Sequence, residues 1–327
     1  MLVSINCVTY NHESYIEKTI EGFLMQKTNF EFEIIIGEDC STDRTREIIH
    51  SYMERYPKRI NLITSESNVG SGQNSMRVFA ASSGKYIALC EGDDYWVDEN
   101  KLQKQIDLME SMPSCSMCIH AATVIDETGV PTGDNIQPYL ENRISSIEDI
   151  IFKGGGFCHT GSIVFKRSLL EEIPSFLSQA HVGDYALQLW CASKGEVHYI
   201  NEVMSAYRTG AKDSWTIEMF SRTESRIRLA QNDILLLEGF NLETDKQYAS
   251  IINKTIRKRE FDILMMQNNI AGMKADKYRD IIAELSFLKR GRIYTKVLFP
   301  RLYLSLAKVK GQLKEKKANF VNRGEFK

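Results

Sequence analysis

The sequence predicts an α/β fold with a mainly parallel sheet, followed by a helical C-terminal region. Short runs of branched apolar residues alternate with helical periodicity over the first hundred residues, and polar turns follow these runs. From Glu218 onward, apolar and charged residues recur at helical spacing with few turn signals. We therefore place an α/β domain at residues 1–215 and a helical region at residues 216–327.

The α/β pattern predicts individual strands and helices. Strands are expected at residues 2–8, 32–36, 60–64, 86–90 and 162–165, and helices at about 14–24, 42–53 and 185–193. The first helix is expected to begin at Ser14, where Glu17 completes a capping box. Because right-handed crossovers make parallel strands end at one edge of the sheet, the residues after the strands are expected to lie together.

Acidic residues follow two of these strands. Asp39 comes after the second strand, and Glu91, Asp93 and Asp94 come after the fourth. Carboxylates this close repel each other unless a cation offsets their charge. Oxygen ligands without His or Cys suit Mg²⁺ or Mn²⁺, which also bind diphosphates. The residues alone therefore predict a divalent metal site, with a solvated acidic turn that caps a helix as the alternative.

Three ordered segments resemble the family 2 glycosyltransferases, which have a GT-A fold, over about residues 3–208. SINCVTYNHESYIEKTI is similar to the family's opening strand and helix, IIGEDCSTDRT to its nucleotide-binding turn, and GKYIALCEGDDYW to its metal-binding strand end. The resemblance implies a GT-A catalytic domain with a Rossmann-like mixed sheet at residues 1–215. It also implies an enzyme that transfers a sugar from a nucleotide-diphosphate donor.

The resemblance implies donor-binding residues on several turns. The nucleotide-sugar is expected to contact Thr9, Asn11, Glu13, Asp39, Asn68, Asn74, Glu91, Asp93 and Arg208. Asp39 is expected to accept a hydrogen bond from the base, and Arg208 to pair with the diphosphate. Asp93 and Glu91 are expected to hold Mn²⁺ or Mg²⁺. Glu91 stands where Asp is more common, so contact through water or with the ribose stays open, as do helix capping for Asn11 and a structural salt bridge for Arg208.

The resemblance also implies a catalytic base and an acceptor side. An acceptor hydroxyl is a poor nucleophile until a base removes its proton, and Asp184, at the expected start of a helix, fits this role. A plain helix N-cap is the alternative. The acceptor side is expected at Asp94, Trp96, His159 and Thr160, with core packing for Trp96 and a structural role for His159 as alternatives.

Composition and charge limit the compartment and the partners. Seven scattered cysteines and the lack of a signal-peptide pattern favour the cytoplasm, and no apolar run is long enough to span a bilayer. Residues 285–327 hold 12 Lys+Arg against 2 Asp+Glu. This basic amphipathic tail is expected either to contact an anionic membrane at the inner face of the cell or to pack on the acidic domain. Nucleic-acid binding is not expected, because the tail's aromatic residues form an apolar face rather than stacking platforms.

The resemblance thus predicts an inverting transfer, from a UDP-sugar to a hydroxyl of a saccharide or lipid-linked acceptor, in cell-surface polysaccharide synthesis. A nucleotidyltransferase is one alternative, but it should carry a glycine-rich basic loop after the first strand, and VTYNHES has none. A non-catalytic nucleotide-sugar-binding or scaffold protein is the other. Such a protein would tolerate the loss of Asp93 or Asp184.

Overall fold

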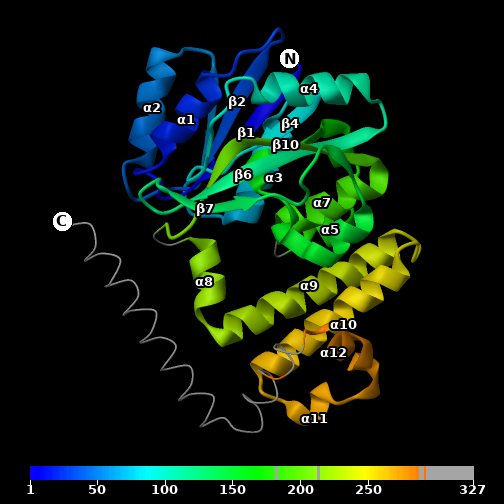
Figure 1. The fold of residues 1–327 in the computed structure, drawn as a ribbon. Coiled ribbons are helices and arrows are strands. Elements are labelled where there is room, and N and C mark those ends of the chain that lie inside the picture. The colour runs from blue at the N-terminus through cyan, green and yellow to red at the C-terminus, as the bar shows by residue number, and fades with distance from the viewer. Residues whose placement is uncertain (181–182, 212–213, 287–290, 292–327) are drawn as a thin grey trace, which may run out of the picture. The chain divides into compact units, whose positions relative to one another are not determined.

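A computed structural model describes residues 1–180, 183–211, 214–286 and 291. Contacts divide the chain into two units, Met1–Asn253 and Lys254–Lys327. The first unit is built on one ten-stranded sheet with helices on both faces, and the described part of the second is helical (Figure 1). The α/β prediction is therefore confirmed. The boundary at residues 215/216 stays a prediction, and the basic tail lies outside the described residues.

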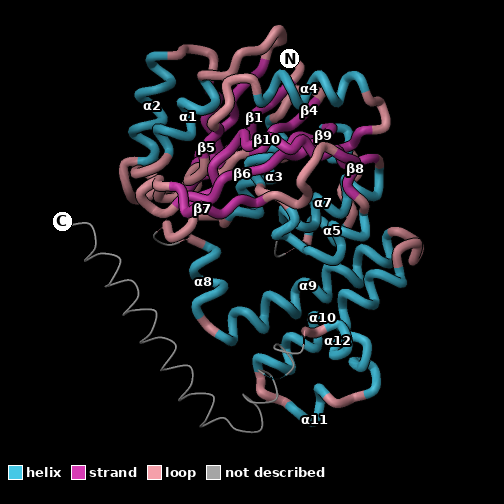
Figure 2. The backbone as a smooth tube through the Cα atoms, viewed as in Figure 1, coloured by secondary structure: helices cyan, strands magenta, loops and turns pink. Residues whose placement is uncertain are grey.

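The strands form one continuous sheet (Figure 2). They are β1 Val3–Thr9, β2 Phe32–Glu38, β3 Ile60–Thr64, β4 Tyr86–Leu89, β5 Tyr95–Trp96, β6 Cys115–Ile125, β7 Pro131–Ile136, β8 Arg143–Ser145, β9 Val164–Lys166 and β10 Glu196–Arg208. Their order is β3-β2-β1-β4-β9-β6-β10-β5, with β7 paired to β6 and β8 paired to β10.

The strand directions place several strand ends at one edge. β1 is parallel to β2 and β4, and β6 is parallel to β10. β9 is antiparallel to both β4 and β6, so β4 and β6 run the same way. The carboxyl ends of β1, β2, β4, β6 and β10 therefore share an edge, which is where open α/β sheets bind ligands.

Alternation along β1 explains how the two faces of the sheet are covered. Val3, Ile5 and Cys7 pack into the core beneath α1 Ile16–Leu24, α2 Thr45–Arg55 and α4 Lys101–Ser111. The intervening side chains face α3 Ser71–Ala81, where Asn6 Nδ2 donates to Ser82 Oγ at 3.0 Å. One face of β1 is thus apolar, and the other makes buried hydrogen bonds.

Of the remaining helices, α5 to α7 belong to the α/β domain, and α8 to α12 agree with the expected helical character of the C-terminal region. They are α5 Ile147–Lys153, α6 Ser175–Ser178, α7 Gly183–Lys194, α8 Trp215–Ser221, α9 Thr223–Glu243, α10 Ala249–Met266, α11 Ile270–Met273 and α12 Arg279–Glu284, with short 3₁₀ helices at Gly154–Phe157, Thr160–Ser162, Arg167–Leu170 and Asp276–Tyr278. The second unit has its own small core of Phe261, Met273, Tyr278 and Ile281. Within the described ranges, no helix has both the length and the apolar character needed to cross a membrane.

The predicted capping box at Ser14 is wrong. Helix α1 begins at Ile16, and its N-cap residue, Tyr15, makes no side-chain cap. The backbone N–H groups of Tyr15 and Ile16 donate to the carbonyl of His12, each at 2.9 Å. Glu17 instead accepts a hydrogen bond from the hydroxyl of Tyr52 at 3.1 Å, so a contact between helices uses the carboxylate that was expected to cap.

Candidate active site

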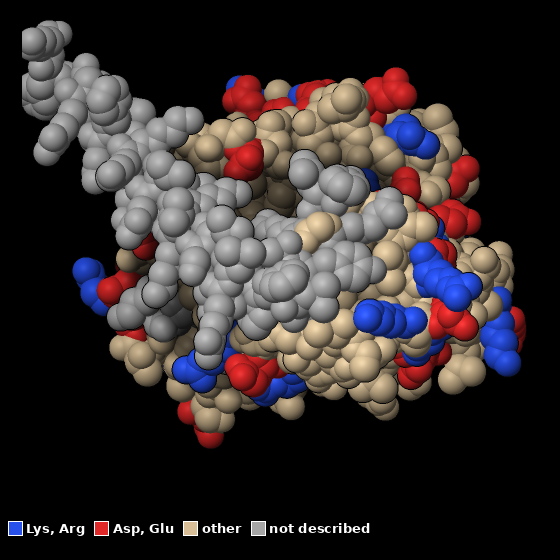
Figure 3. Space-filling view, turned by 60° about the horizontal axis from the view of Figure 1, so that its bottom comes forward, with Lys and Arg blue, Asp and Glu red and all other residues tan. Residues whose placement is uncertain are grey.

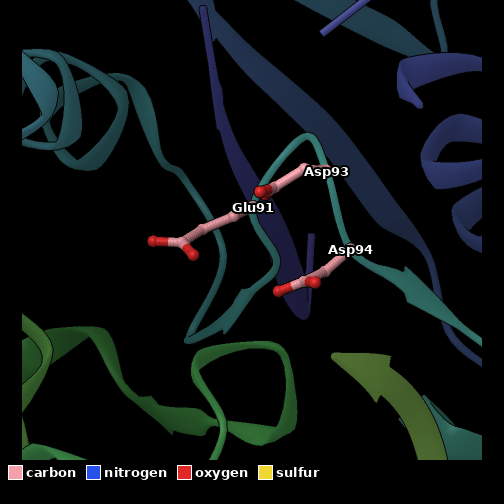
Figure 4. Close-up of side chains that lie close together, drawn as sticks. All are labelled: Glu91, Asp93 and Asp94. Carbon is pink, nitrogen blue, oxygen red and sulfur yellow. The ribbon is translucent and has the colours of Figure 1, made fainter. Parts of the chain in front are cut away.

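Three carboxylates lie on the turn between β4 and β5. One ligand oxygen each from Glu91, Asp93 and Asp94 can be chosen so that all lie within 4.8 Å of one another (Figure 4). Thr19 on α1 fixes this turn, because its hydroxyl donates to the carbonyls of Gly92 at 3.0 Å and Asp94 at 2.6 Å. The turn offers oxygen ligands only, which fits Mg²⁺ or Mn²⁺.

The end of β1 packs directly under the acidic turn. A Cβ atom on Gly92 would lie 2.5 Å from Thr9 Oγ1, so any larger residue at this position would displace the turn. Thr9 is buried, and its hydroxyl pairs with His12 Nδ1 at 3.2 Å. Thr9 therefore supports the site from below, and its predicted contact with the nucleoside stays a prediction.

The electrostatics of the turn suit a cation. Burial, followed by the charge of Asp94, raises the pKa of Asp93 to about 7. Burial and the charges of Asp93, Asp94 and Asp184 raise the pKa of Glu91 well above its usual range. Both shifts disfavour the ionised carboxylates, and a bound divalent ion would reverse them. The turn thus concentrates negative charge that Arg208 offsets only in part.

Asp94 differs from its two neighbours because protein donors contact both of its oxygens. The side chain is 1% exposed. Its Oδ1 accepts the backbone N–H of Arg208 at 2.7 Å, and its Oδ2 lies 2.7 Å from His159 Nε2. The predicted acceptor-side role of Asp94 is therefore untested, while its contacts hold the turn against the end of β10.

Arg208 at the end of β10 binds backbone carbonyls. Its Nε donates to the carbonyl of Asp93 at 2.9 Å, and its Nη1 donates to the carbonyl of Glu127 at 2.9 Å. Its guanidinium carbon lies 4.5 Å from the centre of the Tyr15 ring. The structure thus places Arg208 beside the acidic turn, as expected, and the hydrogen bonds described for it join the acidic turn to the loop after β6.

Asp39 after β2 lies at the N-terminal end of α3. It is 3% exposed, and it accepts the backbone N–H groups of Val69 and Gly70, each at 2.9 Å. The hydroxyl of Ser65 also donates to it, at 3.1 Å. Asn68 shares the N–H of Gly70 at 3.0 Å. Because a helix N-terminus favours negative charge, this arrangement stabilises the carboxylate and orders the loop before α3.

Asn11 and Glu13 join the turn after β1 to the turn after β2. Asn11 Oδ1 accepts the N–H of Thr42 at 2.8 Å, and Glu13 Oε2 accepts the N–H of Arg44 at 2.9 Å. These contacts fix the turn just before α2, whose N-cap residue Arg44 makes no side-chain cap, so they are not the helix cap given as the alternative role of Asn11. Asn74 is buried on α3, where its Nδ2 donates to the carbonyl of Gly37 at 2.7 Å. For Asn11, Glu13 and Asn74, a nucleoside contact stays a prediction.

Asp184 is the second residue of α7, as expected for a helix start. Its Oδ1 accepts the N–H of Tyr185 at 2.7 Å. Burial raises the pKa of Asp184 to about 6 despite this hydrogen bond, and the charge of Asp233 on α9 raises it further. The charge of Asp184 also contributes to the raised pKa of Glu91, so the two carboxylates interact. The structure brings together the predicted base and the predicted metal turn.

The remaining acceptor-side residues differ in exposure. Trp96 is 1% exposed, its Nε1 donates to the carbonyl of Gly161 at 2.9 Å, and its ring packs on Phe23. Its predicted acceptor-side position is therefore corrected to the core alternative, because the ring fills the space under the turn. His159 is also buried, whereas Thr160 is half-buried at the start of a 3₁₀ helix.

Sequence reasoning missed three residues that act on the site. Thr19 supports the acidic turn, Ser205 pairs with His159 Nδ1 at 2.9 Å, and Asp233 influences Asp184. Thr19 and Ser205 are small polar residues inside a helix and a strand. No spacing signal distinguishes them from ordinary polar positions. Asp233 lies outside the region of family resemblance.

Charge on the outer surface does not single out one partner. On the face shown in Figure 3, acidic and basic side chains of the described residues are interspersed. A single-sign field, which steers polyanions such as nucleic acid, is not seen on the described part of that face.

Comparison with known proteins identifies the family to which this chain is similar. The model of glycosyl transferase family 2 matches residues 4–174. The protein Mb1547 of Mycobacterium bovis is 36% identical over 214 residues, which cover 65% of this chain and 60% of that protein's length. TuaG of Bacillus subtilis, a putative teichuronic acid biosynthesis glycosyltransferase, is 34% identical over 209 residues, covering 63% of this chain and 79% of TuaG.

A solved structure shares the fold. The structure of S. aureus TarS residues 1–349 in complex with UDP-GlcNAc matches with a TM-score of 0.57 at 14% identity, covering 91% of this chain and 80% of that chain. At this identity the match shows the fold alone. The predicted GT-A fold is confirmed.

Proposed function

The chain belongs to glycosyl transferase family 2, and on that premise we propose that it is a metal-dependent, inverting enzyme acting on a UDP-sugar. The acceptor is a hydroxyl of a saccharide or a lipid-linked saccharide, and the reaction serves cell-surface polysaccharide synthesis at the cytoplasmic face of the membrane. The interaction between Glu91 on the acidic turn and Asp184 on α7 carries the proposal. The electrostatic influence of Asp184 on Glu91 supports one site that includes both the acidic turn and the start of α7.

Glu91 and Asp93 are the residues that would hold Mn²⁺ or Mg²⁺. Their raised pKa values and oxygen-only chemistry fit a divalent ion. When bound, the ion would stabilise the negative charge that grows on the diphosphate of the leaving nucleoside diphosphate. Arg208 keeps the turn in place through the carbonyl of Asp93 and adds a second positive charge beside it.

Asp184 would take the proton of the acceptor hydroxyl as that oxygen attacks the anomeric carbon from the side opposite the nucleotide. Its Oδ1 is oriented by the N–H of Tyr185. With a pKa of about 6, the carboxylate is mostly ionised at neutral pH and still basic enough to accept a proton. Inversion then follows from a single displacement.

The acceptor capacity of Asp39 supports a uracil base. A carboxylate offers about four lone-pair positions, and its contacts with Ser65, Val69 and Gly70 within the described chain use three of them. One position remains on Oδ2. Uracil presents a single N–H donor on its pairing edge. Guanine presents two donors there, a ring N–H and an amino group. Asp39 therefore matches UDP better than GDP, as in the UDP-GlcNAc complex of TarS.

The teichuronic acid assignment of TuaG supports a saccharide acceptor at the cell surface. Such acceptors are built on lipid carriers or on existing chains. The basic residues at 285–327 fit attachment to anionic lipid, which would bring the enzyme to a lipid-linked acceptor. Sedimentation with anionic vesicles, with and without these residues, tests this part of the proposal.

The test of the reaction is a donor panel. Purified protein is incubated with Mn²⁺ and UDP-, GDP- and dTDP-sugars, and release of the nucleoside diphosphate is measured. We expect slow hydrolysis of one UDP-sugar without an acceptor, and none with the Asp93→Asn variant or with a chelator. A nucleotidyltransferase would release pyrophosphate or a monophosphate instead. If no sugar nucleotide is hydrolysed or bound in a metal-dependent way, the proposal is wrong.

A further inference from the structure

A chain of hydrogen bonds crosses the site beneath the acidic turn and begins and ends on β10. The hydroxyl of Ser205 lies 2.9 Å from His159 Nδ1, and His159 Nε2 lies 2.7 Å from Asp94 Oδ2. The other oxygen of Asp94 accepts the backbone N–H of Arg208 at 2.7 Å. All four residues are buried. The imidazole is therefore one of two links between β10 and the carboxylate, and the backbone N–H of Arg208 is the other.

The two contacts of the His159 ring fit one tautomer when Asp94 is ionised and the ring is neutral. An ionised Asp94 only accepts hydrogen bonds, so His159 Nε2 must carry a hydrogen. In the neutral ring, Nδ1 then accepts the hydroxyl hydrogen of Ser205. Each polar atom of the imidazole has one partner of the correct kind, and the geometry needs no water.

The surroundings keep the ring in this orientation. A Cβ atom on Gly161 would lie 2.6 Å from His159 Cε1, so the ring packs directly on the glycine backbone. The carbonyl of Gly161 is held by Trp96 Nε1 at 2.9 Å, and the carbonyl of His159 accepts the hydroxyl of Ser162 at 2.6 Å. The centre of the Tyr207 ring lies 5.2 Å from the centre of the His159 ring. Packing of this kind locks the side chain in one orientation.

We propose that His159 is a positioning residue for the acidic turn. It holds Asp94 against β10, and this divides the three carboxylates into two groups. Glu91 and Asp93 face the cation, and Asp94 braces the turn that carries them. Such outer hydrogen bonds orient metal ligands and affect affinity although they never touch the metal. The inference rests on the proposed function, since it assigns a metal to this turn.

The test compares two substitutions at position 159, one that cannot form hydrogen bonds and one that can. His159→Leu introduces an apolar side chain and removes both hydrogen bonds, whereas His159→Gln places an amide N–H where Nε2–H lies. Mn²⁺ affinity is measured by electron paramagnetic resonance with UDP present. We expect His159→Leu to weaken Mn²⁺ binding by about 10–100-fold and His159→Gln to recover most of it. Circular dichroism confirms that each variant is folded.

Hydrogen exchange gives a second readout that needs no metal. In metal-free protein, we expect His159→Leu to accelerate amide exchange at residues 91–95 at least tenfold and to leave β2 unchanged, with His159→Gln again close to wild type. If His159→Leu does not fold, Ser205→Ala removes only the partner of Nδ1. It is expected to accelerate exchange in the same segment by a smaller factor.

The outcomes separate this inference from the proposed function. If wild type binds no Mn²⁺, the metal-dependent function fails, and exchange at residues 91–95 still decides whether His159 positions the turn. If wild type binds Mn²⁺ and folded His159→Leu binds it equally well, the positioning role is overturned. It is also overturned if His159→Gln is as impaired as His159→Leu, or if Ser205→Ala leaves exchange unchanged when it is the only folded variant.

Discussion

Asp184 Oδ1 accepts the backbone N–H of Tyr185 at 2.7 Å, yet burial still raises the pKa of Asp184 to about 6. The hydrogen bond favours the ionised carboxylate and removal from water opposes it, and removal from water is the larger effect. A carboxylate in this state is ionised at neutral pH and becomes protonated just below it. This change in ionisation can be followed through the pH dependence of the transfer rate.

The rate of sugar transfer is expected to fall below pH 6. As the pH decreases through the pKa of Asp184, the ionised base is lost, and kcat should fall about tenfold for each further pH unit. The matched variant is Asp184→Asn, whose amide oxygen can still accept the N–H of Tyr185. It should bind UDP within about threefold of wild type and lower kcat by about 10²–10⁴-fold. A flat profile between pH 5 and 8, or loss of UDP binding in Asp184→Asn, would contradict the assignment.

Asp93→Asn is expected to stabilise the metal-free protein while abolishing its response to Mn²⁺. The pKa of Asp93 is raised to about 7, so the folded state holds more protons than the unfolded chain between about pH 4 and 7. Stability from this group therefore decreases as the pH rises through that window. At pH 8 the variant should melt a few degrees above wild type, and at pH 4 the difference should vanish.

The control for Asp93 is Asp134→Asn, which removes an exposed carboxylate on β7. It should leave both the melting temperature and the effect of Mn²⁺ unchanged. Addition of Mn²⁺ at pH 8 should raise the Tm of wild type and of Asp134→Asn, but not that of Asp93→Asn. Equal Mn²⁺ stabilisation of all three proteins would remove Asp93 from the metal site.

Lys101→Met is expected to stabilise the fold near neutral pH. Lys101 is 0% exposed, and its Nζ lies 3.9 Å from the centre of the Trp96 ring with no hydrogen-bond partner in the described part of the chain. Burial lowers its pKa to about 7. The folded state therefore binds fewer protons than the unfolded chain between about pH 7 and 10.5, and wild-type stability from this group increases with pH there.

The Lys101→Met variant should lose this pH dependence and gain about 1–3 kcal/mol of unfolding free energy at pH 7. Lys27→Met is the matched control, because Lys27 is largely exposed beside Glu99 and its replacement should change stability by less than about 1 kcal/mol. Urea unfolding at pH 7 and pH 9 makes the comparison. Destabilisation by Lys101→Met would show that the ammonium has a favourable partner.

Asp39→Asn is expected to weaken both UDP binding and the start of α3. The amide nitrogen of Asn would face the N–H of Gly70 or of Val69, so one hydrogen bond becomes a repulsive contact. We expect a loss of about 1–2 kcal/mol in stability and at least tenfold in UDP affinity. Asp134→Asn, which removes an exposed carboxylate on β7, is the control and should change neither stability nor UDP affinity. Unchanged UDP affinity in Asp39→Asn would exclude base recognition by this residue.

The sequence predicted the sheet well because branched apolar runs and polar turns determine β1 to β4 locally. The expected strand at residues 60–64 agrees with β3, and the other three of these strands shift by at most two residues. The helix start at Ser14 failed for a physical reason. Glu17 has a distant partner, the hydroxyl of Tyr52, and such tertiary competition leaves no trace in local spacing.

The sequence yielded a set of candidate residues but not the contacts between them. The family resemblance proposed Asp93 and Asp184 for one site, yet it did not indicate that Arg208 binds the carbonyl of Asp93 or that Trp96 is buried. Those contacts depend on how β10 and β5 pair, which is a long-range property. The role of Ser205 is of the same kind, because its partner, His159, lies 46 residues away in the sequence.

Among β4, β9 and β6, only the short strand β9 runs against its two neighbours, and this reversal has a consequence for the catalytic centre. Because β9 runs opposite to β4, the chain enters β9 at the edge where β4 exits, and the N–H of Leu89 donates to the carbonyl of Ile163 at 3.0 Å. The segment that leads into β9 therefore lies at the edge of the sheet where the parallel strands end. The segment before this inverted strand thus supplies the imidazole of His159, whereas Glu91, Asp93 and Asp94 follow the end of β4 and Asp184 lies at the start of α7.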